Sequence, residues 1–239
     1  MESPPHLSII IPFFNEEGNV EPVLKEVSEV MSQQKTTYEI ILINDGSSDT
    51  TPALLRAAAN HDSHIRIITH PVNLGQGAAF FSGFRTAQGD VIVTMDGDGQ
   101  NDFRDVPAML PLLPEYDAVF GQRSRRNDPV QKLIASWIGF VFRRIVLGDN
   151  VRDTACGLKV MKKEALNVLI PIKGFHRFIP FMFKQAGLTY ACIDVHHRPR
   201  RLGKTKYSLL RLYFLATIAD LLFMGWFRLN RIPSSRKSH

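Results

Sequence analysis

Short apolar runs alternate with amphipathic stretches along the first hundred residues. The apolar runs are rich in β-branched residues, as is typical of parallel strands buried on both faces. They occupy residues 7–13, 38–44, 65–70 and 90–96. The amphipathic stretches predict helices at residues 20–31, 51–60 and 77–87. This alternation predicts an α/β fold with a doubly wound, mostly parallel sheet.

The second half of the chain is less regular. Residues 103–114 contain three prolines and predict a broken helix. Residues 117–121 and 191–196 predict further strands. The apolar residues 133–147 fit a core helix and a membrane-contacting surface equally well. We expect one domain over residues 1–207, followed by a basic, membrane-proximal helical extension over residues 208–239.

The extension contains sixteen residues, 212–227, that are apolar except for Thr217 and Asp220. A helix of this length covers roughly 24 Å, less than a hydrocarbon core of about 30 Å, and a central Asp costs roughly 2.5 to 3.5 kcal/mol there. A spanning helix is therefore disfavoured. An interfacial helix anchored by Trp226, Arg228 and Arg231 fits better, and packing on the body or on a second subunit is the alternative.

Charge is unevenly distributed along the 239 residues, which carry a formal net charge of +6. From residue 196 onward there are ten Lys or Arg and one acid, so the first 195 residues carry about −3. The basic end is suited to anionic lipid or a phosphorylated substrate. It lacks the regular aromatic interleaving of nucleic-acid binders, so no nucleic-acid partner is expected.

The cysteines and the N-terminus bear on the compartment. Cys156 and Cys192 have neither metal-type nor paired spacing, which predicts reduced thiols in a cytosolic protein. The first residues contain Glu2 and two prolines, with no basic residue before the apolar run, so we expect no cleavable secretion signal.

Polar residues follow each predicted strand of the first half, where ligands bind in doubly wound sheets. Asp96 and Asp98 come directly after the fourth strand and share one face, and Gln100 continues that face. Their hard oxygen donors suit Mg²⁺ or Mn²⁺. A plain turn is the alternative for this segment taken alone. Residues 12–17, 44–49 and 71–77 end the other three strands.

Two nucleotide-binding motifs are excluded. Gly75 and Gly77 begin a dinucleotide-type pattern, but Phe80 stands where its third small residue belongs. No Gly-x-x-x-x-Gly-Lys-Ser/Thr sequence is present.

Taken together, the motifs resemble those of the inverting family 2 glycosyltransferases of the GT-A (Rossmann-like) fold. They are Pro12-x-Phe14-Asn15-Glu16, Asn44-Asp45-Gly46-Ser47-x-Asp49, Asn73-x-Gly75-x-Gly77-Ala78 and Asp96-x-Asp98-x-Gln100. Two later motifs resemble the polyprenyl-phosphate (dolichol-phosphate mannose synthase-like) branch. They are Asp153-Thr154-x-Cys156-Gly157-Leu158-Lys159, before an expected helix, and Arg200-x-x-Gly203-x-Thr205-Lys206-Tyr207. The resemblance covers residues 7–207.

The resemblance implies roles for individual residues. The nucleotide sugar would be bound by Pro12, Phe14, Glu16, Ile43, Asp45, Asp96 and Gly97. Mg²⁺ or Mn²⁺ would be bound by Asp98 and Gln100. The catalytic group would comprise Asp98, Arg123, Arg200 and Lys206, with the cations directed at phosphates or the sugar. Phe14 replaces the Tyr usual in the family, and Ala155-Cys156 replaces Ser-Gly-type neighbours, two departures that bear on the identity of the sugar.

The resemblance implies metal-dependent, inverting transfer of a hexose from a GDP- or UDP-sugar to undecaprenyl or dolichyl phosphate. Residues 174–178 lack the acidic pair with which relatives activate a hydroxyl, and a phosphate acceptor needs no such base. We expect a peripheral enzyme at the cytoplasmic face of the membrane, with a homo-oligomer or a membrane-protein partner possible. The alternatives are a hydroxyl acceptor, with His176 as acid or base, and a non-catalytic nucleotide-binding module that docks on membranes.

Overall fold

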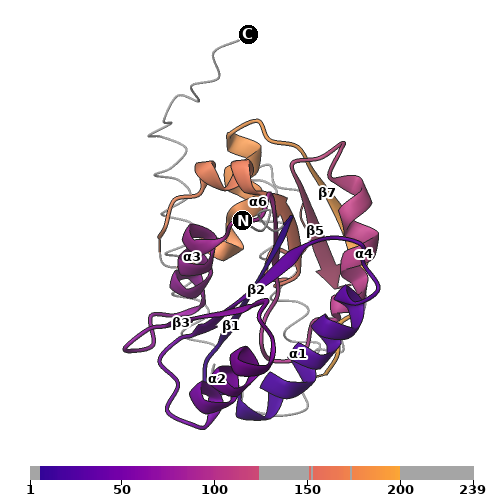
Figure 1. Cartoon of the computed structure of the whole chain (residues 1–239). Helices are drawn as coiled ribbons and strands as arrows, with labels where there is room; N and C mark the ends of the chain where they lie inside the picture. Colours follow the sequence, from indigo (N-terminus) through magenta and orange to yellow (C-terminus); the bar gives the residue numbers. More distant parts are fainter. Residues whose placement is uncertain (1–5, 124–150, 152, 173, 200–239) are drawn as a thin grey trace. The chain divides into compact units, whose positions relative to one another are not determined.

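The computed structural model describes residues 6–123, 151, 153–172 and 174–199 (Figure 1). All of them belong to one of the two units into which the chain divides, comprising Met1–Asn127 and Val151–Gly203. The stretches at 133–147 and 212–227, the boundary at residue 207, Arg200 and Lys206 lie outside the described residues.

One mixed sheet organises the described residues, with strands in the order β3-β2-β1-β4-β6-β5-β7. The strands are β1 (Leu7–Phe13), β2 (Tyr38–Asn44), β3 (Ile65–Thr69), β4 (Val91–Thr94), β5 (Ala118–Arg123), β6 (Lys159–Lys162) and β7 (Tyr190–Val195). Neighbouring strands pair in parallel, except that β6 is antiparallel to both β4 and β5. The predicted α/β architecture with a mostly parallel sheet is confirmed.

Helices cover both faces of the sheet because alternate strand residues point to opposite sides. On one face, α1 (Glu17–Met31) and α2 (Thr51–His61) bury residues such as Val27 and Leu55 against Ile9 and Ile11. On the other face, Gly83 of α3 (Gln76–Thr86) lies against Ile10 and Ile43. Figure 1 shows α1 and α2 together, with α3 placed apart from them. The sheet is therefore doubly wound.

The remaining helices are short. Residues 103–112 form the predicted broken helix, as η1 (Phe103–Asp105), α4 (Val106–Met109) and η2 (Leu110–Leu112). After β6 come η3 (Lys163–Val168), η4 (Phe175–Arg177) and α6 (Ile179–Gln185). Phe175 packs edge-on against Phe81 and Phe84 of α3, which attaches η4 to that helix.

We expected a helix directly after Lys159. This expectation is wrong, because residues 159–162 form strand β6 and η3 begins only after that strand. This strand has four residues, with lysines at both ends around the fully buried Val160 and Met161. So short a run shows no periodicity, and only its place between β4 and β5 makes it a strand.

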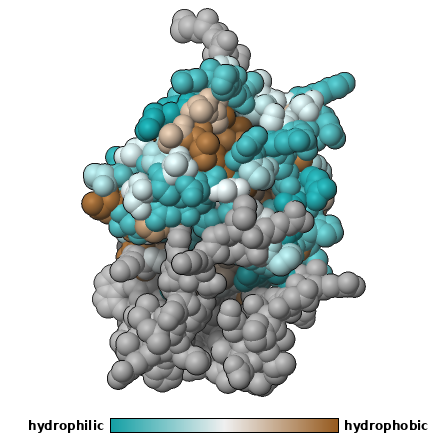
Figure 2. Space-filling view, turned by 90° about the horizontal axis from the view of Figure 1, so that it is seen from below, coloured by the Kyte–Doolittle hydropathy of each residue, from teal (hydrophilic) through white to brown (hydrophobic). Residues whose placement is uncertain are grey.

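On the face shown in Figure 2 the described surface is mostly hydrophilic, with apolar residues gathered in a patch and in smaller spots elsewhere. Among the described residues, no helix is both long enough and apolar enough to cross a membrane.

Candidate active site

The predicted site residues gather where the chain reverses direction across the sheet. After β1 the chain builds β2 and β3 on one side, and it then returns to place β4 on the other side of β1. Crevices at such switch points, outside the carboxyl ends of the strands, are where ligands bind in open α/β sheets. Asp96 and Asp98 follow β4 at this edge, beside the residues that follow β1.

Gly97 allows the ends of β1 and β4 to meet. A Cβ atom at this position would lie closer than 3.0 Å to the carbonyl oxygen of Pro12 and to the ring of Phe13. Only a residue without a side chain fits this approach. This approach brings together Pro12 and Gly97, two residues predicted to bind the nucleotide sugar, beside Asp96.

Reciprocal hydrogen bonds join the loops that follow β1 and β2. The Asn15 amide donates to Ser47 Oγ at 3.0 Å, and the Ser48 amide donates to Asn15 Oδ1 at 2.8 Å. The Glu16 amide donates to Thr51 Oγ1 at 3.0 Å. These bonds fix the loop that carries Phe14, which is partly exposed, and Glu16, which is buried.

The Asp45 carboxylate is enclosed by donors from the loop after β3. Its Oδ1 accepts from His70 Nδ1 and the Leu74 amide, and its Oδ2 accepts from Asn73 Nδ2 and the Gly75 amide, at 2.8 to 3.0 Å. His70 Nε2 also lies within hydrogen-bond distance of Ser82 Oγ, at 2.9 Å. Asp45 therefore holds the loop between β3 and α3 in place. Its role toward a nucleoside stays a prediction.

Ile43 is fully buried and its side chain packs toward Gly83 of α3. The structure therefore places Ile43, a residue predicted to bind the nucleoside, in the core beneath the site.

Asp96 and Asp98 form a pair of carboxylates just after the end of β4. Burial raises the pKa of Asp96, the negative charge of Asp98 raises it further, and the cations of Lys159 and Arg123 oppose the shift. Gln76 Nε2 donates to Asp96 Oδ1 at 2.5 Å, and the Asp96 amide donates to Asn101 Oδ1 at 2.9 Å. Two mutually repelling carboxylates are stabilised by a divalent cation, so this donor set fits Mg²⁺ or Mn²⁺.

Gln100 is hydrogen-bonded to both Asp98 and Arg198. Its backbone amide donates to Asp98 Oδ1 at 3.1 Å, and its side-chain Nε2 donates to the Arg198 carbonyl at 3.3 Å. With Nε2 so engaged, Oε1 is the atom suited to bind a metal. Among the described residues, no group of three or more His, Cys, Asp or Glu is arranged to hold a metal ion.

Arg123 is the last residue of β5, and its positive charge acts on Asp96. Its Nε and Nη2 bind Asp153 Oδ2 and Oδ1 at 2.5 and 2.8 Å, and the Asp153 side chain is almost fully buried. This two-point pairing fixes the plane of the guanidinium group. The motif at residues 153–159 thus orients the predicted cation.

The motif at residues 153–159 also packs against the segment that carries Asp96. The sequence alone did not reveal this contact. Thr94 Oγ1 donates to the Gly157 carbonyl at 2.8 Å, and Lys159 Nζ donates to the Cys156 carbonyl. Lys159 is 4% exposed, and burial lowers the pKa of its ammonium group. A buried cation therefore lies near the paired carboxylates. Its place in the motif was the only sequence signal.

His176 lies behind α3, against Gly77 and Phe80. Burial, reinforced by the charges of Lys159 and Arg177, lowers its pKa to about 3. Its Nδ1 is buried without a hydrogen-bond partner among the described residues. A neutral, enclosed imidazole fits a structural role better than a role as acid or base. Arg200 and Lys206 lie outside the described residues, and their roles stay predictions.

Comparison with known proteins places this geometry in a family. The Glycosyl transferase family 2 profile matches residues 8–170. Undecaprenyl-phosphate 4-deoxy-4-formamido-L-arabinose transferases from Yersinia pestis (strain Pestoides F) and Yersinia pseudotuberculosis (serotype O:3, strain YPIII) are each 34% identical over 208 residues, or 86% of this chain. The chain matches 64% of the length of these curated relatives.

Two solved structures share the fold. Glucosyl-3-phosphoglycerate synthase from Mycobacterium tuberculosis, in complex with Mn²⁺, UDP-glucose and phosphoglyceric acid, aligns with a TM-score of 0.69 at 22% identity, covering 92% of this chain and 79% of that one. A mannosyltransferase from Pyrobaculum calidifontis, in complex with GDP-mannose and Mn²⁺, aligns with a TM-score of 0.65 at 18% identity, covering 96% and 65%. With its GT-A fold and a family match over more than half of its length, the chain belongs to glycosyl transferase family 2.

Proposed function

We propose that this protein transfers a hexose from a GDP- or UDP-sugar to a polyprenyl phosphate, undecaprenyl or dolichyl, with inversion at the anomeric carbon. The observation that carries the proposal is the Asp96–Asp98 pair beside Gln100 at the switch point of the sheet. The names of the curated relatives support a polyprenyl phosphate acceptor. The ligands of the solved relatives support a nucleotide sugar and a divalent metal.

The donor end of the site is assigned to the residues around Asp96. Asp98 and Gln100 would hold Mg²⁺ or Mn²⁺, while Pro12, Gly97 and the loops after β1 and β2 would hold the nucleotide. A bound divalent cation neutralises the charge that develops on the departing diphosphate. Asp153 orients Arg123. Arg123 would act on the sugar or on the acceptor phosphate. Arg200 and Lys206 complete the proposed set from the basic end of the chain.

A hydroxyl acceptor needs a base, and His176 is poorly suited to that role. A phosphate acceptor needs no base and therefore fits this site better. An acceptor phosphate oxygen bonds to the anomeric carbon as the bond from that carbon to the diphosphate breaks, and a nucleoside diphosphate leaves. A phosphate monoester has a second pKa of about 6, so it is ionised at neutral pH without help. His176 is buried, and its pKa of about 3 makes it a weak base for activating a hydroxyl.

The proposed acceptor is a lipid, so the enzyme must work at a membrane surface. The ten basic residues and one acid from residue 196 onward give this end of the chain a charge of +9, which attracts anionic lipid. We place the protein at the cytoplasmic face as a peripheral enzyme, as a homo-oligomer or with a membrane-protein partner.

The test is transfer of labelled sugar from a panel of UDP- and GDP-sugars into the organic phase, with polyprenyl phosphate and Mg²⁺ or Mn²⁺. We expect label with one donor class, lost on chelation of the metal. Asp98→Asn should lower the rate by roughly 100-fold or more. Asp90→Asn is the matched control, because Asp90 is an exposed carboxylate before β4, at the opposite end of that strand.

Two outcomes would replace the proposal. Transfer to a saccharide or protein hydroxyl, abolished by His176→Gln, would establish a hydroxyl acceptor. Nucleotide binding without transfer from any donor, with a cellular function that survives Asp98→Asn, would establish a non-catalytic membrane-docking module.

A further inference from the structure

The segment that follows β7 pairs with the loop that carries Gln100. His197 and Asn101 form an isolated antiparallel bridge. The Arg198 amide donates to the Gln100 carbonyl at 2.8 Å, and Gln100 Nε2 donates to the Arg198 carbonyl at 3.3 Å. The backbone of Arg198 thus contacts both the main chain and the side chain of the proposed metal ligand.

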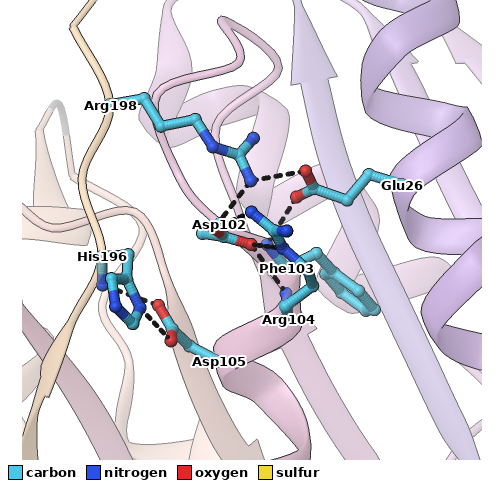
Figure 3. Close-up of polar contacts among 7 residues, drawn as sticks. All are labelled: Glu26, Asp102, Phe103, Arg104, Asp105, His196 and Arg198. Carbon is cyan, nitrogen blue, oxygen red and sulfur yellow. Dashed lines mark hydrogen bonds and ion pairs between the residues drawn. The ribbon is translucent and has the colours of Figure 1, made fainter.

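The Arg198 side chain anchors this pairing to α1 and, a second time, to the loop that carries Gln100 (Figure 3). Its Nη2 lies 2.6 Å from Glu26 Oε2 on α1 and 2.7 Å from Asp102 Oδ2, two residues after Gln100. Glu26 Oε1 also accepts from the Phe103 amide at 2.7 Å. The side chains of Glu26 and Asp102 are only 17% and 7% exposed, so these ion pairs are screened less than those at an open surface.

We propose that Arg198 is a positioning residue that fixes Gln100 so that its amide oxygen faces the metal site. The inference rests on the proposed function, because that proposal makes Gln100 a metal ligand. The physical reason is geometric: two carboxylates hold the guanidinium, the guanidinium fixes the main chain of residue 198, and the Arg198 carbonyl accepts from Gln100 Nε2, which also lies 3.4 Å from His197 Nε2. Without the guanidinium, the Gln100 amide can rotate away from the site.

Arg104 provides a matched control. It pairs with the same carboxylate, through Nε to Asp102 Oδ1 at 2.8 Å and Nη2 to Oδ2 at 2.6 Å. Its side chain is 67% exposed, however, and it belongs to η1, not to the segment after β7. Arg104→Ala therefore removes a similar ion pair from Asp102 and leaves the contact between Arg198 and Gln100 intact.

The experiment measures Mn²⁺ binding directly, by electron paramagnetic resonance, with whichever of UDP or GDP the wild type binds. We expect Arg198→Ala to weaken Mn²⁺ binding by roughly 10- to 100-fold, as is common for residues that orient metal ligands. Arg198→Lys should fall between, because an ammonium group is a single charge without the planar geometry of guanidinium. Arg104→Ala should stay within about twofold of wild type. Nucleotide binding in the absence of metal should be unchanged in all of these variants.

Three outcomes would overturn the inference. Wild-type Mn²⁺ binding retained in Arg198→Ala overturns the positioning role and leaves the proposed function standing. Equal weakening by Arg104→Ala assigns the effect to Asp102 alone. Absence of Mn²⁺ binding in the wild type overturns the metal site, and the positioning role with it. If Arg198→Ala does not fold, Arg198→Lys and Glu26→Gln carry the same test.

Discussion

At the scale of single residues, Gly157 shows how the carboxylate site depends on an absent side chain. A Cβ atom there would lie closer than 3.0 Å to all three terminal atoms of the Asp96 carboxyl group. Gly157→Ala must therefore displace Asp96 or the turn at Cys156. We expect the variant to fold and its transfer rate to fall by roughly tenfold or more, because misplacement of about 1 Å is costly in a catalytic site. Steady-state transfer kinetics and a thermal melt provide the measurement.

Gly77→Ala is the comparison for that variant. Its Cβ would make only ordinary contacts, at 3.4 Å from the nearest atoms, and Ala is favoured over Gly within a helix by about 0.5 to 1 kcal/mol. Wild-type activity is expected for Gly77→Ala. Equal loss in both variants would contradict a specific role for the Gly157 contact.

Asp45 presents a choice between loop support and nucleotide contact. Asn in its place offers one acceptor oxygen for four donors, so at least two donors lose their partner. We expect Asp45→Asn to lower the free energy of unfolding by about 1 to 3 kcal/mol, measured by denaturant titration. Asp62→Asn, at the partly exposed end of α2, should cost less. Wild-type stability with lost nucleotide binding would instead assign Asp45 to the ligand.

At the scale of elements, the sequence predicted strands best where burial is complete. The bounds of β1 and β2 match the predicted residues 7–13 and 38–44, because both strands are nearly continuous apolar runs, interrupted by Ser8 and Glu39, that end in polar loops. Strand β6 was missed because its four residues carry two lysines, and α6 was missed because its seven residues show no clear period.

The residues of the candidate site were likewise predicted only where a local sequence pattern indicates them. Asp96, Asp98 and Gln100 alternate in sequence, so a continuing strand would place them on one face. In the structure β4 ends at Thr94 and residues 97–98 form a turn, so strand periodicity does not extend to them, although the charge of Asp98 still acts on Asp96. The contacts of Arg198 with Glu26 and Asp102 join residues 172 and 96 positions apart. No local pattern encodes such pairs, and only the topology of the sheet brings them together. The burial of Lys159 beneath Asp96 is likewise a product of the unpredicted strand β6.

The packing of η4 on α3 predicts a dependence of stability on pH. The folded state keeps His176 neutral, with a pKa of about 3, whereas an exposed imidazole has a pKa near 6.5. Between these values the unfolded chain binds the extra proton, so stability falls as the pH drops below about 6.5 and the loss is complete near pH 3. Above pH 7 the residue contributes no dependence.

Thermal melts of wild type and His176→Gln from pH 4 to pH 8 test this expectation. The difference in melting temperature between the two proteins should shift in favour of the variant as the pH falls, because glutamine does not titrate. A difference that stays constant across this range would show that His176 is not a buried neutral imidazole in the folded state.

At the scale of the whole molecule, the separation of charge predicts how the protein meets a membrane. The first 195 residues carry about −3, and the remaining residues carry +9. We expect co-sedimentation with vesicles that contain anionic lipid, weakened by added salt because exposed charges are screened. Each basic residue near such a surface contributes about 1 kcal/mol, so the triple variant Arg228→Gln, Arg231→Gln, Arg236→Gln should bind roughly 100-fold more weakly.

The matched variant Lys25→Gln, Lys35→Gln, Arg56→Gln removes the same charge from exposed positions of the main domain, and it should bind like wild type. Equal weakening by both triple variants would mean that net charge, and not its location at the end of the chain, governs binding to the membrane.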